Sequence, residues 1–467
     1  MNNRHPSFHD SGRHITVTVT DIAMPGDLGV AKADDFVLFV PGTIPGDRVV
    51  VRIVKREKRY GYGEVIAIEK PSSHRVEPPC PHFGTCGGCT IQSMGYARQL
   101  ELKSAHLRQT LKRIGRIDAP EDIFEDITPS PAVYWYRSKV ELAFGNALRS
   151  VITGMRMSTS PAGPARPGVV AIPGCRIFNP SLKKIVDIVD DHIHGEGYSP
   201  YDEQTKRGYL RHLIVRQSMA TGALMVILET KDGQSHDMGE LYRLLKREVP
   251  EVTSMWRAFN NRPGPYIDYG SMRHEGGDLF MEELLSGLRF RVYPASFFQP
   301  NPAAAGLLYE RIGNIAAAGR FGNVLGLYCG MGPIELALSR HARKVVGIDS
   351  QKANIENARE NALINGITNC SFLAGKIEDI AADPAFKKPD LVVIDPPRSG
   401  VSQRGIGLIT SLAPGAIFYV SCNPATLARD LAHLTAAGFS IELIAPFDFF
   451  PHTSHLETLV ALRRIKR

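Results

Sequence analysis

Cys422 stands at the junction of an expected strand and an expected helix near the end of the chain. Residues 416–420 form an apolar run with the length and residue types of an interior strand. Asn423 is a good helix N-cap, and Pro424 suits a first helical position, where a backbone N–H is not needed. A thiol beside the partly positive start of a helix loses its proton more easily. The pattern therefore offers Cys422 as a nucleophile, although a lone cysteine without context is more often a small buried residue.

Three further cysteines, Cys80, Cys86 and Cys89, form a C-x5-C-x2-C pattern among prolines and glycines. Soft thiolates at this spacing bind iron–sulfur clusters or zinc. Three ligands leave one position open, and the next cysteine along the chain is Cys175, in a turn-like segment. We expect these four residues to form one site, and their spacing leaves both metals open. The odd total of seven cysteines argues against a secreted disulfide framework and for a reducing cytosol.

A glycine turn followed by two strand-end acids predicts a nucleoside-binding site in the last third of the chain. Gly330 and Gly332 allow the backbone to approach a ligand closely at a helix start. Asp349 follows Gly330 by 19 residues, at a strand end where a carboxylate can bind ribose hydroxyls, and Asp395 ends a later strand. The turn lacks the complete G-x-G-x-x-G that a dinucleotide pyrophosphate needs. S-adenosylmethionine has no phosphate, so the pattern favours a methyltransferase.

The elements that must position these residues divide into three expected domains along the 467 residues. About five short alternating strands predict a small OB-like β-barrel at residues 12–70. Residues 71–290 mix strands and helices, which predicts a central α+β domain with the metal-binding cysteines. Residues 291–467 alternate strands and helices, which predicts a Rossmann-like α/β domain with a mostly parallel sheet.

Composition and charge are those of an ordinary globular protein and are compatible with a polyanionic partner. Hydrophobic residues make up 43% of the chain and charged residues 22%. No run of about 18 apolar residues occurs, so we expect no membrane span. The net charge of +7 suits a polyanionic partner, and the basic segment 55–59 precedes Tyr60 and Tyr62. Such residues can hold phosphates and stack bases, although a solvated hairpin has the same pattern. We expect a cytoplasmic monomer.

Six motifs occur in order along the chain: C-x5-C-G-G-C, FFQPN, LYCGMG, DPPRSG, SCNP and FPHTSHLET. Together they resemble the RNA uracil-5-methyltransferase family, from about residue 14 to the end of the chain. The barrel resembles a TRAM domain, an RNA-binding module that the ribosomal-RNA members of the family carry and the tRNA-specific type lacks. The resemblance therefore implies methylation of uridine C5 and favours 23S ribosomal RNA as the substrate. The T-loop uridine of tRNA is the runner-up.

The same resemblance implies roles for individual residues. It implies a [4Fe–4S] cluster on four cysteines, Cys80, Cys86, Cys89 and Cys175. It implies S-adenosylmethionine contacts from four residues, Gln299, Tyr328, Asp349 and Asp395. Cys422 is the implied nucleophile and Glu457 the implied base. Three positions depart from the family: Gly326 where an acid is usual, Pro333 where Asn is common, and Lys376 where a polar uncharged residue is frequent.

The implied reaction suits these residue types. C5 of uracil is too poor a nucleophile to take a methyl group unaided, and addition of the Cys422 thiolate to C6 makes an enolate with electron density at C5. Glu457 then removes the C5 proton, while Asp395 and Arg398 help to orient the base. Two rival functions remain. An amino-methyltransferase would use D-P-P to hold an exocyclic amine, and an RNA-binding assembly factor would carry a degenerate cofactor site.

Overall fold

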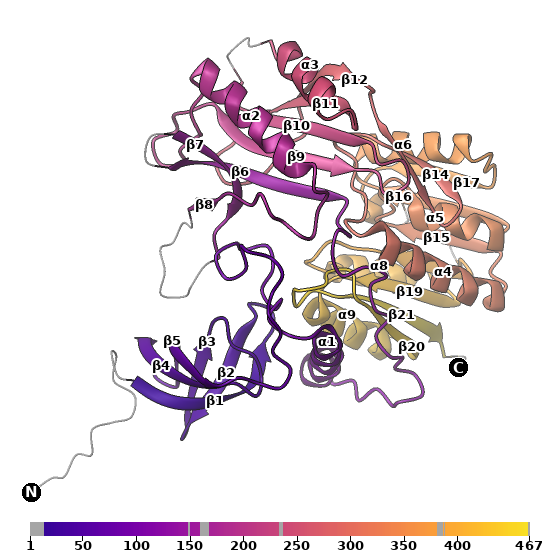
Figure 1. The fold of residues 1–467 in the computed structure, drawn as a ribbon. Helices are drawn as coiled ribbons and strands as arrows, with labels where there is room; N and C mark the ends of the chain where they lie inside the picture. Colours follow the sequence, from indigo (N-terminus) through magenta and orange to yellow (C-terminus); the bar gives the residue numbers. More distant parts are fainter. Residues whose placement is uncertain are drawn as a thin grey trace, which may run out of the picture.

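The computed structural model describes residues 14–147, 150–158, 168–232, 237–380, 386 and 388–465. Their strands form a closed five-stranded barrel, two seven-stranded sheets and a two-stranded sheet. Figure 1 shows the barrel at the lower left, one large sheet above it, and the C-terminal sheet with its helices at the right. The predicted α/β class with an N-terminal OB-like barrel is confirmed.

The barrel consists of strands in which exposed and buried residues alternate. In β1 (His14–Ala23), Ile15, Val17 and Val19 face the core while their neighbours face outward. The other strands are β2 (Leu28–Ala33), β3 (Phe36–Val40), β4 (Arg48–Arg56) and β5 (Tyr60–Lys70). Their order is β1-β2-β3-β5-β4, and β1 pairs with β4 to close the barrel, which leaves no free sheet edge.

Residues 91–115 have helical periodicity; helix α1 covers Tyr96–Thr110 and continues as a π-helical turn over Leu111–Gly115. The turn packs on α9 (Pro424–Ala436) of the C-terminal domain. A Cβ at Gly115 would lie 2.8 Å from the carbonyl oxygen of Ala428, so this close approach requires glycine. Helix α1 therefore lies between the barrel and the C-terminal sheet (Figure 1).

The central domain contains a seven-stranded sheet in the order β12-β11-β10-β9-β6-β7-β8. Its strands are β6 (Lys139–Ala147), β7 (Ser150–Arg156), β8 (Val169–Val170), β9 (Leu210–Gln217), β10 (Leu224–Thr230), β11 (Val252–Phe259) and β12 (Met272–Gly277). Helices α2 (Leu182–Glu196) and α3 (Gly239–Glu248) bury their apolar stripes in its core. The mixed α+β character is as predicted.

Strand β6 is shorter than its sequence pattern indicates. Residues 134–144 have the composition of a strand, but β6 begins only at Lys139. Trp135 has a φ of 51°, outside the extended region. The N–H groups of Trp135 and Arg137 donate to carbonyls of Arg176 and Ile177, close to Cys175. The segment before β6 therefore binds the cysteine loop instead of extending the sheet.

The C-terminal sheet has the order β17-β16-β15-β18-β19-β21-β20. Its strands are β15 (Asn323–Leu327), β16 (Lys344–Asp349), β17 (Cys370–Ala374), β18 (Leu391–Ile394), β19 (Ala416–Ser421), β20 (Phe439–Phe447) and β21 (Glu457–Arg464). The strands from β17 to β19 are parallel, and β21 runs antiparallel between β19 and β20. The alternation of strand and helix thus gives the mostly parallel sheet that was predicted.

Apolar residues on both faces of this sheet belong to two separate core clusters. The helices of the domain are α4 (Pro302–Gly319), α5 (Pro333–Leu338), α6 (Lys352–Ile364), α7 (Ile377–Ile380), α8 (Gln403–Ser411) and α9, with a 3-10 turn at Ser339–His341. A hairpin of β13 (Met281–Leu285) and β14 (Leu288–Val292) precedes them and packs on α6.

The division into domains at 12–70, 71–290 and 291–467 stays a prediction from the sequence. Within the part of the chain that the structure describes, every helix is too short or too polar to cross a bilayer.

Candidate active site

Three parallel strands end side by side at one edge of the C-terminal sheet. β15, β18 and β19 are consecutive neighbours, so their carboxyl ends meet at the same edge. The residues that directly follow them are Tyr328, Asp395 and Cys422. The chain crosses from β15 to β16 on one side and later to β18 on the other, and ligands of α/β sheets bind at such a reversal.

Glu457 reaches this edge from the opposite direction. β21 runs antiparallel to β19, and Thr458 pairs with Ser421. Cys422 follows Ser421, and Glu457, the first residue of β21, precedes Thr458. The two residues therefore stand across from each other at the ends of the adjacent strands. The structure brings the two residues that the sequence assigned as nucleophile and base to adjacent strand ends.

The backbone around Cys422 forms as the sequence predicted. Asn423 caps α9, because its Oδ1 accepts a hydrogen bond from the Ala425 N–H at 3.0 Å, and Pro424 is the first helical residue. The Asn423 side chain also donates to the carbonyl of Arg398 at 2.9 Å. The strand end that bears the thiol is thus joined to the loop after β18.

The expected low pKa of Cys422 is wrong for the unliganded chain. The pKa of the Cys422 thiol is raised to about 11, mainly by burial and also by the carboxyls of Glu457 and Asp395, while Arg398 and a backbone hydrogen bond act in the other direction. The sequence indicates the helix start beside the thiol. It does not indicate that the thiol is buried or that the carboxyls of Glu457 and Asp395 lie near it. These effects outweigh the helix, so Cys422 is a protonated thiol at neutral pH.

The two carboxyls near Cys422 have raised pKa values. Burial raises the pKa of Glu457 well above its usual range, with a further rise from Asp395 and an opposing effect of Arg398. Burial also raises the pKa of Asp395 to about 7. Glu457 is only 4% exposed. Carboxyls with such pKa values can exchange protons near neutral pH, which is what acid–base catalysis needs.

The glycine turn after β15 leaves open space in front of its backbone. Gly330 has a φ of 54°, and a Cβ placed on it would meet no atom of the described residues within 4 Å. Its N–H donates to Oδ2 of Asp349 at 3.0 Å, which joins the turn to the end of β16. Gly332 has a φ of 82°, and a Cβ there would lie 2.8 Å from the Phe372 ring. Both positions have a backbone conformation that favours glycine, and their role in binding a cofactor stays a prediction.

The segment that contains Gln299 is attached through Asn301 to the loop between β20 and β21. Gln299 is 8% exposed, and its carbonyl accepts from the Ser138 hydroxyl at 3.2 Å. Asn301 is fully buried, caps α4, and donates to the carbonyl of Phe449 at 3.0 Å. The sequence analysis gave Asn301 no role, since the residue it contacts lies 148 positions away.

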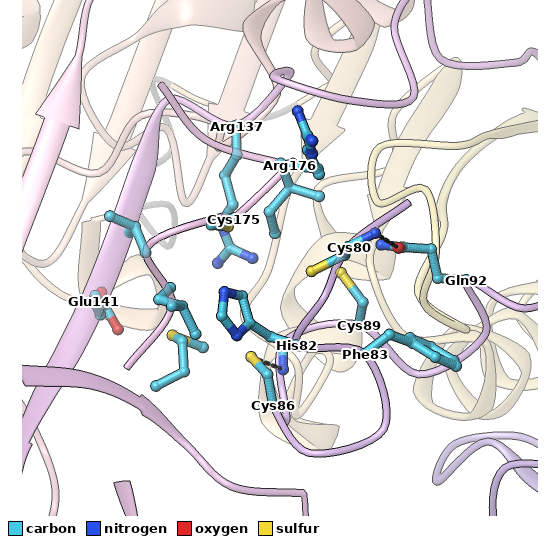
Figure 2. A pocket seen from close by; sticks show the side chains of 15 residues that line it. Cys80, His82, Phe83, Cys86, Cys89, Gln92, Arg137, Glu141, Cys175 and Arg176 are labelled. Carbon is cyan, nitrogen blue, oxygen red and sulfur yellow. Dashed lines mark hydrogen bonds between the residues drawn. The ribbon is translucent and has the colours of Figure 1, made fainter. Parts of the chain in front are cut away.

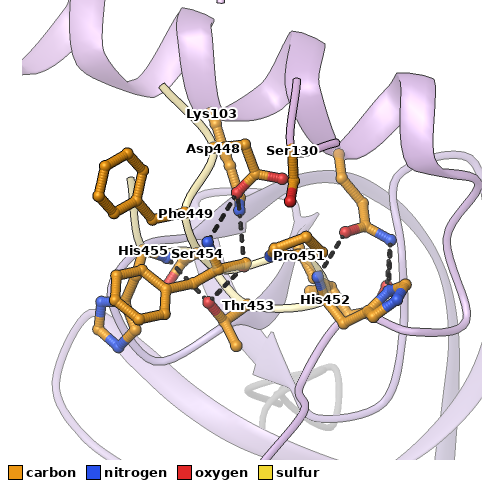
Figure 3. A network of polar contacts seen from close by, with 12 residues as sticks. Lys103, Ser130, Asp448, Phe449, Pro451, His452, Thr453, Ser454 and His455 are labelled. Atoms are coloured by element: carbon orange, nitrogen blue, oxygen red, sulfur yellow. Dashed lines mark hydrogen bonds and ion pairs between the residues drawn. The ribbon is translucent and has the colours of Figure 1, made fainter. Parts of the chain in front are cut away.

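A buried ion pair holds the loop between β20 and β21 (Figure 3). Lys103 of α1 contacts Oδ1 of Asp448 at 2.6 Å, and both side chains are completely buried. Lys103 also donates to the Phe450 carbonyl at 3.0 Å, and the Tyr96 hydroxyl donates to the other oxygen of Asp448 at 2.8 Å. Helix α1 therefore fixes the loop that leads to Glu457.

His452 belongs to the same loop network and has a structural role. Gln99 of α1 accepts from the His452 N–H at 2.8 Å, and Nε2 of His452 lies 2.9 Å from the carbonyl of Val133. The ring stacks on Tyr134 with centroids 4.6 Å apart. Burial lowers the pKa of His452 to about 4, so the ring is neutral at pH 7 and does not act as a base toward the site.

A cavity of about 270 Å³ opens above Cys422 and is lined by three parts of the chain. Met24 and Pro25 come from the β1–β2 turn of the barrel, and His106 and Arg113 come from α1 and its π-helical turn. The remaining lining residues include Arg398, Cys422 and His455. The β1–β2 turn is joined to the loop between β20 and β21, because Oδ2 of Asp27 accepts from the Ser454 N–H at 3.3 Å. The barrel and the catalytic domain thus share one cavity.

The four cysteines that the sequence grouped together line a second cavity, of about 120 Å³ (Figure 2). Cys80, Cys86 and Cys89 come from one loop, and Cys175 comes from the turn before α2. Burial raises the pKa of Cys89 to about 12, and the charges of the other three thiols act in the same direction. The structure therefore brings together all four residues that the sequence selected.

The donor set of this cavity fits a thiolate-bound group, but the thiols do not converge on one point. Among the residues that the structure describes, no group of three or more Cys, His, Asp or Glu side chains is placed to hold a single metal ion. Burial raises the pKa of Cys175, and backbone N–H groups of Ile177 and Phe178 oppose that rise only in part. A mutually repelling set of thiolates needs a cationic group to share.

The three departures from the family pattern have different surroundings. Lys376 is exposed ahead of α7, and Pro333 is the first residue of α5. Gly326 lies inside β15, between Gly347 of β16 and Val393 of β18. The first two positions lie at the starts of helices, while the third is in the core beneath the glycine turn.

Comparisons with known proteins agree with this geometry. Residues 283–465 match the sequence profile described as tRNA (Uracil-5-)-methyltransferase, and residues 10–66 match the TRAM domain. An uncharacterized RNA methyltransferase of Listeria monocytogenes is 34% identical over 98% of this chain and 99% of its own. Another from Gloeobacter violaceus is 35% identical over 97% of both chains.

One solved structure resembles nearly the whole molecule. It is the tRNA (uracil-54, C5)-methyltransferase of Pyrococcus abyssi in complex with S-adenosyl-L-homocysteine. The TM-score is 0.74 at 27% identity, and the match covers 96% of this chain and 100% of the other. The glycine turn, the acids at the strand ends and the barrel all fall within the matched regions. The chain belongs to the family of S-adenosylmethionine-dependent RNA (uracil-5-)-methyltransferases.

Proposed function

We propose that this enzyme methylates C5 of a uridine through a transient bond between Cys422 and C6 of the base. The observation that carries the proposal is the position of Cys422 across from Glu457, at the same strand edge as the glycine turn. Cys422 lines a cavity of about 270 Å³, and Glu457 stands beside it at the adjacent strand end.

The bonds in this route balance without any further reactant. The Cys422 sulfur forms a bond to C6, and the electrons of the C5–C6 double bond pass into an enolate. C5 then takes the methyl group, and the methyl–sulfur bond of the donor breaks. Glu457 accepts the proton of C5, the C5–C6 double bond forms again, and the Cys422–C6 bond breaks.

The proposed cofactor contacts are Gln299, in the segment before α4, and residues of the glycine turn and the neighbouring strand ends. The latter are Tyr328, Gly330, Gly332, Asp349 and Asp395. S-adenosylmethionine, when bound, supplies an electrophilic methyl group. Asp349 is oriented for a ribose, because its carboxylate already accepts from the N–H groups of Gly330 and Gln351 at 3.0 and 2.8 Å.

Cys422 must lose its proton after the substrate binds. His455 lines the same cavity, and burial lowers the pKa of His455, so its neutral ring is available as a proton acceptor at pH 7. Arg398 lowers the pKa values of both Cys422 and Glu457. A cationic cofactor near Asp395 and Glu457 favours their ionised forms in the same way.

The barrel offers a surface for unstacked bases of the RNA. The rings of Phe39, Tyr60 and Tyr62 lie with centroids 5.7 to 5.9 Å apart, and Lys55 lies 5.8 Å from the Tyr62 ring. Tyr60 is 40% exposed. Aromatic faces with a nearby cation can stack bases and bind phosphates, as single-stranded nucleic acids require.

We favour 23S ribosomal RNA as the substrate, because the barrel resembles the RNA-binding module of the ribosomal-RNA members. The T-loop uridine of tRNA is the second candidate. It is favoured by the structural likeness to the Pyrococcus abyssi enzyme, which acts on uracil 54 of tRNA and matches over 96% of this chain. That match includes most of the barrel, so the barrel alone does not decide between the two RNAs.

We propose that Cys80, Cys86, Cys89 and Cys175 hold a [4Fe–4S] cluster. A single zinc ion needs four sulfurs within about 2.3 Å of one point, whereas a cluster spreads its four ligands over four irons. The four thiols line one cavity, a donor set that suits a thiolate-bound group, and the resemblance to the family favours the cluster over zinc. Anaerobic purification should give iron and sulfide in about equal amounts; stoichiometric zinc instead would contradict the cluster.

The test of the function is a map of 5-methyluridine in ribosomal and transfer RNA from cells with and without the gene. Loss of methylation at a 23S uridine supports the favoured substrate, and loss at the tRNA T-loop supports the second. Loss of a methylated exocyclic amine would identify an amino-methyltransferase. No loss, together with no binding of S-adenosylmethionine, would identify a non-catalytic assembly factor. The monomeric state and the cytoplasmic location stay predictions from the sequence.

A further inference from the structure

Glu335 is a buried carboxyl that the proposed mechanism does not use. It is the third residue of α5, directly after the glycine turn, and it is 3% exposed. Its Oε2 atom is buried and has no hydrogen-bond partner among the described residues. An unpaired polar atom in such a place costs free energy, so a partner from outside the chain is expected.

The Glu335 carboxyl occupies the space next to Gly326, the position at which the family usually has an acid. A Cβ placed on Gly326 would overlap Oε1 of Glu335 and lie 2.8 Å from its Cδ and Cγ atoms. Gly326 has no positive φ, so its glycine is not explained by backbone conformation. The absence of a side chain at residue 326 is explained by the carboxyl that enters from α5.

The charged groups that act on Glu335 are all of the same sign. The pKa of Glu335 is raised to about 8, mainly by burial; Asp395 and Asp349 act in the same direction, and a backbone hydrogen bond opposes them. The charge of Glu335 also raises the pKa values of Cys329 in the turn and of Tyr309 of α4. Within the described ranges, no lysine, arginine or histidine forms an ion pair with Glu335. A cationic ligand would offset the cost of this arrangement.

We propose that Glu335 supplies from α5 the carboxylate that is missing at position 326, and that it binds the ammonium group of S-adenosylmethionine. This inference rests on the proposed cofactor orientation. Asp349 holds the ribose at the end of β16, and the reacting methyl group lies toward Asp395 and Cys422. The amino-acid end of the cofactor is then the part nearest to β15 and to Glu335. The side chain is a cofactor-binding residue that changed its place in the fold.

The experiment compares three ligands by calorimetry in the absence of RNA. S-adenosylmethionine and S-adenosylhomocysteine carry the ammonium group, and 5′-methylthioadenosine lacks it. Glu335→Gln should weaken binding of the first two about tenfold and change binding of the third less than about twofold. Glu356→Gln, the same substitution on an exposed face of α6, should change none of them.

A reciprocal exchange tests the relocated carboxylate itself. Gly326→Asp alone should weaken all three ligands, because its side chain collides with Glu335. Adding Glu335→Ala to Gly326→Asp should restore the affinity for S-adenosylmethionine to within about threefold of the unsubstituted chain, since the carboxylate returns to the strand. Thermal melting of each variant shows that the comparison is made on folded protein.

Two results would overturn this inference and leave the proposed function intact. One is an equal loss of all three ligands in Glu335→Gln, which would assign the residue to shaping the turn. The other is a folded double variant that binds S-adenosylmethionine no better than Gly326→Asp. An unsubstituted chain that binds none of the three ligands would overturn the proposed function together with this inference.

Discussion

The two cysteine-lined cavities of this molecule use the same side chain in different surroundings. Burial raises the thiol pKa in both, to about 11 at Cys422 and about 12 at Cys89. Around Cys422 the neighbours are Glu457, Asp395 and Arg398, which can move or stabilise protons. Around Cys89 the main neighbours are three more thiols.

The difference shows that the neighbours of a cysteine, and not its own burial, indicate its chemistry. A thiol paired with a carboxyl on an adjacent strand can form and break a covalent bond. Thiols that surround one another need a shared cation before they ionise together. The first cavity is therefore catalytic and the second is a metal-cluster site in our account, and the following changes test that contrast.

The largest effect is expected for Cys422→Ala. Methyl transfer to RNA should fall by at least about 10⁴-fold, because no other group can saturate the C5–C6 bond. Binding of S-adenosylmethionine and the melting temperature should stay unchanged, which separates lost chemistry from lost folding. A variant that keeps a tenth of the activity would remove Cys422 from the role of nucleophile.

Glu457→Gln should slow turnover by about 10² to 10⁴-fold and allow the covalent complex to accumulate. The methyl group is then transferred, but the C5 proton stays on the base and the Cys422–C6 bond persists. A denaturing gel of the enzyme with labelled RNA measures this complex. Slow turnover with no trapped complex would place the defect before the proton-removal step.

Lys103→Met should destabilise the protein by about 3–5 kcal/mol, because it leaves Asp448 buried without its counter-charge. Chemical denaturation monitors the loss, and Asp448→Asn in the same chain should recover part of it. Lys352→Met is the matched control: its ion pair with Glu356 spans 3.6 Å with both side chains exposed, and its removal should cost less than about 1 kcal/mol. Equal effects at both sites would contradict a buried anchor for the catalytic loop.

The smallest effect concerns pH. Since the pKa of Cys422 is raised to about 11, its thiolate fraction should grow about tenfold per pH unit from pH 7 to pH 10. The rate of alkylation of Cys422 by iodoacetamide in the unliganded enzyme should follow that slope, and peptide mass spectrometry identifies the modified residue. A rate that levels off by pH 8 would instead restore the low pKa that the helix start suggested.

Local sequence patterns predicted the elements that carry the site. Alternation over residues 15–68 predicted the barrel, and the strand-turn-helix pattern around Gly330 predicted the parallel sheet. The cap of α9 at Asn423 also formed as expected. These features depend on residues within a few positions of one another, which sequence periodicity records.

Contacts between distant residues were not predictable in the same way. Lys103 and Asp448 are 345 positions apart, and neither stands in a pattern that marks it as charged and buried. The pKa of Cys422 depends on Glu457 from another strand, and the carboxyl beside Gly326 comes from α5. Such pairings arise only when the sheet has formed and the helices have packed on it.

The covalent route is tested most directly with an RNA in which 5-fluorouridine replaces the target uridine. Fluorine at C5 cannot be removed as a proton, so the enzyme with S-adenosylmethionine should remain bonded to the RNA. Mass spectrometry of the digested complex should find a methylated fluorouridine on the peptide that contains Cys422. An RNA that is methylated at a normal uridine but forms no adduct with its fluorinated counterpart would contradict the account.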